Sequence, residues 1–117
     1  NIGDIFAYSD FNGDISQWDV SNVKRMTGMF RGTNFNGDIS KWDVSNVNFM
    51  NIMFCEAKFN GDISKWDVHN VKDMTMMFVR ADFNGDISKW DVSKVEHTWS
   101  MFAGCPIKEE YKPKFIK

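Results

Sequence analysis

A block of ten residues recurs four times, almost unchanged, along this chain of 117 residues. It reads Phe-Asn-Gly-Asp-Ile-Ser-Lys-Trp-Asp-Val and begins at Phe11, Phe35, Phe59 and Phe83, always 24 residues apart. A fixed period of this length is typical of proteins whose repeats stack on one another, because a single repeat cannot bury its own apolar side chains. The period therefore constrains the fold more than any other feature of the sequence.

The period divides the chain into one domain of repeats with two incomplete ends. Ile2 and Phe6 lie one period before Met26 and Phe30, so the chain begins within a repeat, and we expect it to be a piece of a longer array. The last repeat departs from the pattern from Thr98 onward, and the polar residues that follow predict a C-terminal cap. The predicted divisions are a partial repeat at 1–10, full repeats at 11–34, 35–58, 59–82 and 83–106, and the cap at 107–117.

The first apolar segment of each repeat predicts a short strand. Trp42 and Val44 alternate with the polar Lys41 and Asp43, which is the pattern of a half-buried strand. Because the tryptophans share their register with isoleucine and valine, we expect them to face the core and not to form an outward platform for sugars. This prediction covers Trp18, Trp42, Trp66 and Trp90.

The second apolar segment predicts about two turns of helix. Its apolar side chains recur at offsets that trace one helical stripe, namely Val23, Met26, Met29, Phe30 and Thr33 in the first repeat. Ser21-Asn22 and Ser45-Asn46 stand where a helix N-cap is expected, and Ser93 with Glu96 forms a capping box. The Asn-Gly pair before each strand predicts a tight turn.

Composition excludes several functions. The net charge of −2 argues against a nucleic-acid surface, and no apolar run approaches the ~20 residues of a membrane-spanning helix. Cys55 and Cys105 occupy different repeat positions two copies apart, so we predict two free thiols. No catalytic motif is present, and near-identical repeats do not supply the single asymmetric cluster that catalysis requires. We therefore predict a protein that is not an enzyme and has no cofactor.

The repeat resembles two known kinds of sequence. Residues 39–47 are similar to the strand region of leucine-rich repeats, with Val47 in the place of their ladder asparagine. The whole unit, together with the ending at 105–113, resembles the roughly 25-residue repeat of BspA-like bacterial surface proteins and mycoplasma lipoproteins. Over residues 1–117 this implies an α/β fold, a right-handed leucine-rich-repeat-like solenoid in which each coil has a short parallel strand and a short helix. It also implies a cell-surface or secreted protein used in adhesion or recognition.

If the coils fold as the resemblance implies, three positions of each repeat point outward from the strand. They form columns that we predict as a polar face for a protein or glycan partner. The candidate residues are Lys41, Asp43, Ser45, Lys65, Asp67, His69, Lys89 and Asp91. The alternative is a solvated surface whose aspartates hydrogen-bond to the nearby Ser-Asn backbone.

A calcium site is a remote alternative. Each Asn-Gly turn is followed by an aspartate, and a column of such oxygen ligands could bind Ca²⁺; these are Asp14, Asp38, Asp62 and Asp86. Against this, the turns lack a glycine-rich nonapeptide, and Asp and Asn are common turn formers. His69 and His97 occupy different repeat positions, so we predict no metal site.

Two functions remain as hypotheses. The first is a recognition or adhesion module that binds its partner through the strand face. The second is a structural spacer whose exposed coil ends stack end to end on other copies. Neither requires nucleic acid or a membrane span within the chain.

Overall fold

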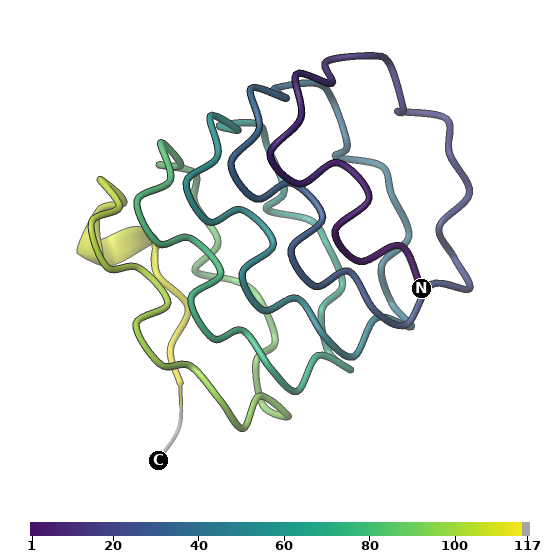
Figure 1. The fold of residues 1–117 in the computed structure, drawn as a ribbon. Helices are drawn as coiled ribbons and strands as arrows, with labels where there is room; N and C mark the ends of the chain where they lie inside the picture. Colours follow the sequence, from purple (N-terminus) through teal and green to yellow (C-terminus); the bar gives the residue numbers. More distant parts are fainter. Residues whose placement is uncertain (116–117) are drawn as a thin grey trace.

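The computed structural model describes residues 1–115. The chain winds through successive 24-residue copies that lie side by side, as Figure 1 shows, and the molecule measures 38 × 29 × 20 Å. Within these residues the one regular element is a short 3-10 helix, η1 (Glu109–Tyr111). No helix of the described chain is long enough to cross a membrane.

The predicted α/β leucine-rich-repeat-like solenoid is wrong. Residues 1–115 contain no α-helix and no strand. In these residues the β-bridges between copies are isolated parallel ones, Arg25 to Phe49, Phe49 to Asp73 and Asp73 to His97. The 24-residue spacing of the aromatic side chains remains as the organising feature of the fold.

The segment predicted as a helix folds as consecutive tight turns. The N–H of Met29 donates to Met26 O at 3.2 Å, and that of Thr33 donates to Phe30 O at 3.2 Å, so each bond spans three residues and not the four of an α-helix. Gly28 and Gly32, the third residue of each turn, have φ of 65° and 67°. A positive φ every four residues is incompatible with a right-handed helix. The predicted N-caps and the Ser93–Glu96 capping box are therefore wrong as well.

These turns aim alternate N–H groups at the next copy. Gly28 donates to Asn51 O at 3.1 Å, Phe30 to Met53 O at 2.9 Å, and Gly32 to Cys55 O at 2.8 Å. We call residues 26–32 and their equivalents 2–8, 50–56, 74–80 and 98–104 the turn runs. Because the bonds join one copy to the next, the backbone polar groups of a turn run are satisfied only by its neighbours.

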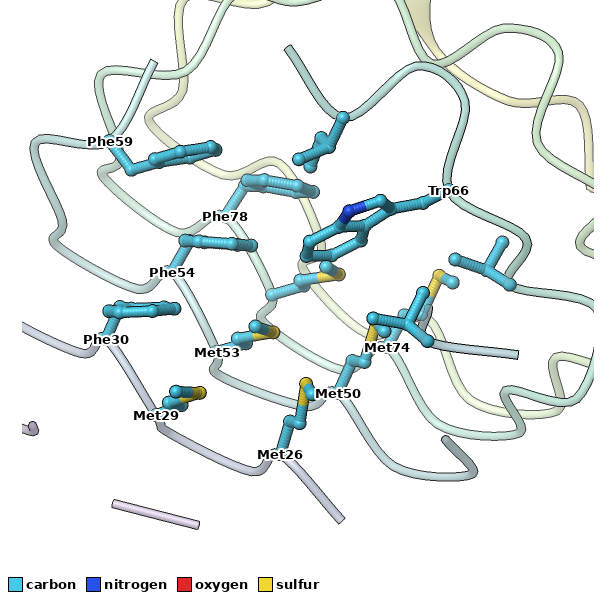
Figure 2. Close-up of a cluster of buried hydrophobic side chains, with 14 of the residues drawn as sticks. Met26, Met29, Phe30, Met50, Met53, Phe54, Phe59, Trp66, Met74 and Phe78 are labelled. Carbon is cyan, nitrogen blue, oxygen red and sulfur yellow. The ribbon is translucent and has the colours of Figure 1, made fainter. Parts of the chain in front are cut away.

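The core consists of columns of identical side chains. Figure 2 shows Phe30, Phe54 and Phe78 stacked over one another beside columns of methionines. The ring centroids are 5.6 Å apart between Phe30 and Phe54 and 5.5 Å apart between Phe54 and Phe78, and all three side chains are 0% exposed. The apolar stripe was therefore correctly predicted as core, although its backbone is not helical.

The inward orientation of tryptophan is confirmed for three of the four. Trp42, Trp66 and Trp90 are buried, and each indole Nε1–H donates to an isoleucine carbonyl of the preceding copy, at 2.9–3.0 Å. Trp18 is 40% exposed, so the prediction is wrong there. The other three tryptophans are covered by an isoleucine segment that lies 27 residues earlier in the chain. Residues 1–10 contain no equivalent of that segment to cover Trp18.

Asparagine side chains add hydrogen bonds between copies. The Oδ1 atoms of Asn36 and Asn60 accept the backbone N–H of the asparagine 24 residues later, both at 2.8 Å. On another side, Asn46 Nδ2 donates to Ser21 O and Asn70 Nδ2 to Ser45 O, both at 2.7 Å. Asn46, predicted as part of a helix N-cap, thus joins adjacent copies.

The C-terminal segment continues half of a further copy. Ile107 is buried in the column of Phe83, and Tyr111 O accepts the N–H of Ile87 at 3.0 Å. Residues 109–115 then cross the end of the molecule (Figure 1). The last two residues of the predicted cap, 116 and 117, lie outside the described residues.

Candidate functional site

The eight predicted site residues lie at the surface. Ser45 and His69 are half-buried, and the others are exposed, namely Lys41, Asp43, Lys65, Asp67, Lys89 and Asp91. Since the described chain has no strand, this surface is formed by irregular backbone and is not the strand face that was predicted. We call these eight residues the polar face.

The aspartates of the polar face stabilise local turns. Asp43 Oδ1 accepts hydrogen bonds from Ser45 Oγ at 2.6 Å and Ser45 N at 3.0 Å. These bonds favour the ionised carboxylate and lower the pKa of Asp43 below its ordinary value. Hydrogen bonding by Ser93 likewise lowers the pKa of Asp91. The hydrogen bonding expected for a solvated surface is therefore present at these aspartates.

The third copy replaces this serine with a histidine. His69 Nδ1 lies 2.7 Å from Asp67 Oδ1, and the same carboxylate oxygen accepts His69 N–H at 3.2 Å. When the imidazole is protonated, the contact is an ion pair between side chains that are 41% and 58% exposed. The polar face therefore differs in one copy, where the aspartate is paired with an imidazole in place of a serine hydroxyl.

Two equivalent shallow hollows lie between adjacent copies on this surface. One, of about 230 Å³, is lined by Ser40, Lys41, Asp62 and Lys65. The other, of about 100 Å³, lies one copy earlier and is lined by Ser16, Gln17, Asp38 and Lys41. The lysines were predicted on the binding face, whereas Asp38 and Asp62 were assigned to turns. The 24-residue period that these aspartates share with the lysines was the signal that could have joined them.

The turn aspartates are occupied by their own serines. Asp62 Oδ1 accepts Ser64 N at 2.9 Å and Ser64 Oγ at 2.7 Å, and Asp38 makes the equivalent bonds to Ser40. The serine hydroxyl and N–H lower the pKa of both carboxyls. In residues 1–115 no three His, Cys, Asp or Glu side chains are grouped so that they could hold a metal ion.

A larger cavity lies at the C-terminal end of the molecule. It measures about 730 Å³ and lies between the last turn run and residues 109–115. Its lining includes Ser100, Phe102, Glu109, Lys112, Pro113 and Phe115. We call it the end groove. This region was predicted as a polar cap without a cavity, although Phe102 continues the phenylalanine column.

Comparison with known proteins identifies one family. Neither the curated proteins nor the solved structures contain a match to this chain. A family model, described as Mycoplasma protein of unknown function, DUF285, matches residues 1–113. Because this match includes nearly the whole repeat array, the chain belongs to the DUF285 family of Mycoplasma proteins.

Proposed function

We propose that this chain is a non-enzymatic recognition module that binds a protein or glycan partner through its polar face. The observation that carries the proposal is the pair of hollows between adjacent copies, each with a carboxylate and at least one lysine in its lining. Because equivalent groups recur one copy apart, a ligand with a repeated structure can make several similar contacts with them. Several weak contacts on one ligand combine into a higher overall affinity.

The chemistry of the hollows suits a polar ligand. The lysine ammonium groups supply hydrogen-bond donors, and the carboxylates supply acceptors. The side chains that line the larger hollow, Ser40, Lys41, Asp62 and Lys65, are all polar. A hydroxyl-rich sugar or a polar peptide segment can exchange hydrogen bonds with such a surface without burying an apolar area.

A cell-surface location is part of this proposal. The repeat unit resembles that of BspA-like bacterial surface proteins and mycoplasma lipoproteins, and an adhesive role follows from that resemblance. The family match supports a repeat protein of the Mycoplasma type.

The test is binding to glycan and matrix-protein arrays by the chain and by a charge-reversed variant, Lys41→Glu with Lys65→Glu. Lysines are preferred to aspartates here because Asp43 and Asp62 also hold local turns, so that their reversal would disturb the backbone. A matched control, Lys24→Glu with Lys72→Glu, changes the net charge equally at exposed positions outside both hollows.

The proposal expects a ligand that binds the chain and the control but is lost in the Lys41/Lys65 variant. A ligand that binds all three proteins equally would place recognition elsewhere. Equal loss in both variants would show a nonspecific dependence on charge. Unchanged urea unfolding midpoints confirm that the variants are folded.

A further inference from the structure

The turn runs present a second surface, which is separate from the polar face. The two middle residues of each turn lie at its tip, and the tips of neighbouring copies form two rows because the turn runs lie side by side (Figure 1). In the four full repeats the first row consists of residues 27–28, 51–52, 75–76 and 99–100, and the second of residues 31–32, 55–56, 79–80 and 103–104. We call both rows the turn-tip face. We propose that this face binds the same face of a second copy of this chain, with the two molecules antiparallel.

The four full repeats differ from one another mainly in and around the turn-tip face. The ten-residue block that begins each repeat is nearly constant, and so are the buried methionines and phenylalanines. By contrast, positions 28, 52, 76 and 100 carry glycine, isoleucine, methionine and serine. Stacking of the copies depends on the constant positions, so the differences at the tips are not needed for the fold. They give this face one asymmetric pattern along the stack, which a specific interaction requires.

Two of the turn tips hold apolar side chains in a conformation that favours glycine. Ile52 has φ of 52° and Met76 has φ of 55°, and both side chains are only half-buried. The equivalent residue of the first full repeat is Gly28, which adopts its φ of 65° without this strain. Ile52 lies against that glycine, since its Cδ1 is 3.6 Å from the position that a Cβ of Gly28 would take. The parts of Ile52 and Met76 that remain exposed are available to an apolar partner.

The repeat period determines which residues meet in an antiparallel pair. A twofold axis between repeats 35–58 and 59–82 reverses the order of the copies in the second molecule. Each residue of 35–58 then faces the residue 24 positions later in that molecule. Ile52 faces Met76, which joins two apolar side chains, and Glu56 faces Arg80, which joins opposite charges. Because the interface is symmetric, each of these contacts occurs twice.

The central charges are complementary both within one molecule and between two. Within the chain, Arg80 Nη1 donates to Glu56 Oε2 at 3.3 Å, and the two side chains are 71% and 40% exposed. The second molecule places another carboxylate opposite each Arg80 and another guanidinium opposite each Glu56. Four side chains of alternating sign then lie together, and such a network stabilises more than one exposed ion pair does.

The outer tips are complementary in size. The Trp99 indole is 76% exposed and does not line the end groove. The same twofold axis places it opposite Thr27 and Gly28 of the second molecule, a tip that carries only one small side chain. Tryptophan, methionine and arginine are enriched in the interfaces between proteins, and the turn-tip face contains all three.

The experiment exchanges the central charges and measures association by sedimentation velocity. For the parent we expect the average mass to rise above the 13.6 kDa of one molecule as concentration increases. Glu56→Arg and Arg80→Glu each place like charges opposite one another in a pair of identical molecules, so each variant alone is expected to associate at least about tenfold more weakly. An equimolar mixture of the two variants restores opposite charges at every one of these contacts. We therefore expect the mixture to associate as tightly as the parent.

Two further variants separate this interface from other effects of charge and folding. Ile52→Gly keeps a residue that suits the backbone, as Gly28 does, and is expected to weaken association about tenfold. Glu110→Arg is the matched control for Glu56→Arg, because Glu110 is an exposed glutamate outside the turn-tip face, and it is expected to associate like the parent. A parent that stays monomeric at millimolar concentration, a mixture that associates no better than its components, or equal losses in Glu56→Arg and Glu110→Arg would each overturn the proposal. The polar face takes no part in these contacts, so either proposal can fail without the other.

Discussion

Replacing Trp66 with phenylalanine tests whether the tryptophan bond between copies stabilises the fold. The Trp66 indole is buried, donates from Nε1 to Ile39 O at 2.9 Å, and stacks on Trp90 with a centroid separation of 6.4 Å. Trp66→Phe removes this donor and shortens the ring inside a packed column. Trp18→Phe is the matched control, since Trp18 has the same repeat position but is 40% exposed.

The expected decrease in the free energy of unfolding follows from the contacts of Trp66. Ile39 O also accepts the N–H of Trp42 at 3.2 Å, so the substitution removes one of two hydrogen bonds and does not leave the carbonyl unsatisfied. That loss is worth about 1 kcal/mol. The lost part of the indole adds about 1–2 kcal/mol at ~0.8 kcal/mol per buried carbon. We therefore expect Trp66→Phe to lower the free energy of unfolding by about 2–3 kcal/mol and Trp18→Phe by less than about 1 kcal/mol.

Urea denaturation followed by circular dichroism measures both variants. Subtracting the change in the free energy of unfolding of Trp18→Phe from that of Trp66→Phe cancels the intrinsic effect of replacing an indole with a phenyl ring. Equal destabilisation of the two variants would refute the reasoning, because it would mean that neither burial nor the bond to the preceding copy matters. An unchanged slope of the unfolding curve shows that both variants unfold as the parent does.

Three further predictions concern the backbone, the asparagines and the carboxylates. Glu56 has φ of 58°, so Glu56→Gly is expected to raise the free energy of unfolding by up to about 1 kcal/mol, whereas the control Lys58→Gly lowers it; urea unfolding that shows the same sign for both would contradict this. Asn60→Ala removes the acceptor of the Asn84 N–H at 2.8 Å, so hydrogen exchange at that amide is expected to accelerate at least about tenfold, whereas Asn60→Asp retains the acceptor and the protection. Serine hydrogen bonds lower the pKa of Asp38, Asp43 and Asp62 below 3.8, so their stabilisation is complete above that pH and is lost as the pH falls below it. Urea midpoints measured between pH 5 and about pH 2 are expected to fall less steeply for Asp38→Asn with Asp62→Asn than for the parent.

The sequence predicted which side chains are buried better than it predicted the backbone. Met26, Met29, Phe30 and Thr33 are all buried, as the apolar stripe indicated. Spacings of three and four residues, however, fit both a helix and a run of four-residue turns, so the stripe alone could not distinguish them. Gly28 and Gly32, four residues apart inside that stripe, were the local signal for turns. In the repeat at 35–58 the same positions are Ile52 and Glu56, whose positive φ no propensity would predict.

The candidate sites were likewise predicted better in their side-chain exposure than in their backbone path. Lys41 and Lys65 were placed correctly at the surface, although they lie in turns that the Trp42 and Trp66 N–H groups close and not in the strand that the alternation predicted. Their pairing with Asp62 could not be derived from alternation, since it depends on how one copy is offset against the next. The end groove depends on where residues 109–115 cross the last turn run, and no repeat pattern specifies that path.

The positive φ angles and the stacking of copies require each other. A residue such as Ile52 at φ of 52° carries a conformational cost of about 1–2 kcal/mol, and five turn runs contain ten such positions, three of them glycines. That conformation also turns alternate N–H groups toward the neighbouring copy, where they meet carbonyls at 2.7–3.2 Å. A single copy would bear the cost and leave these donors without partners. Each interface between copies must therefore supply the stabilisation that a helix obtains within itself.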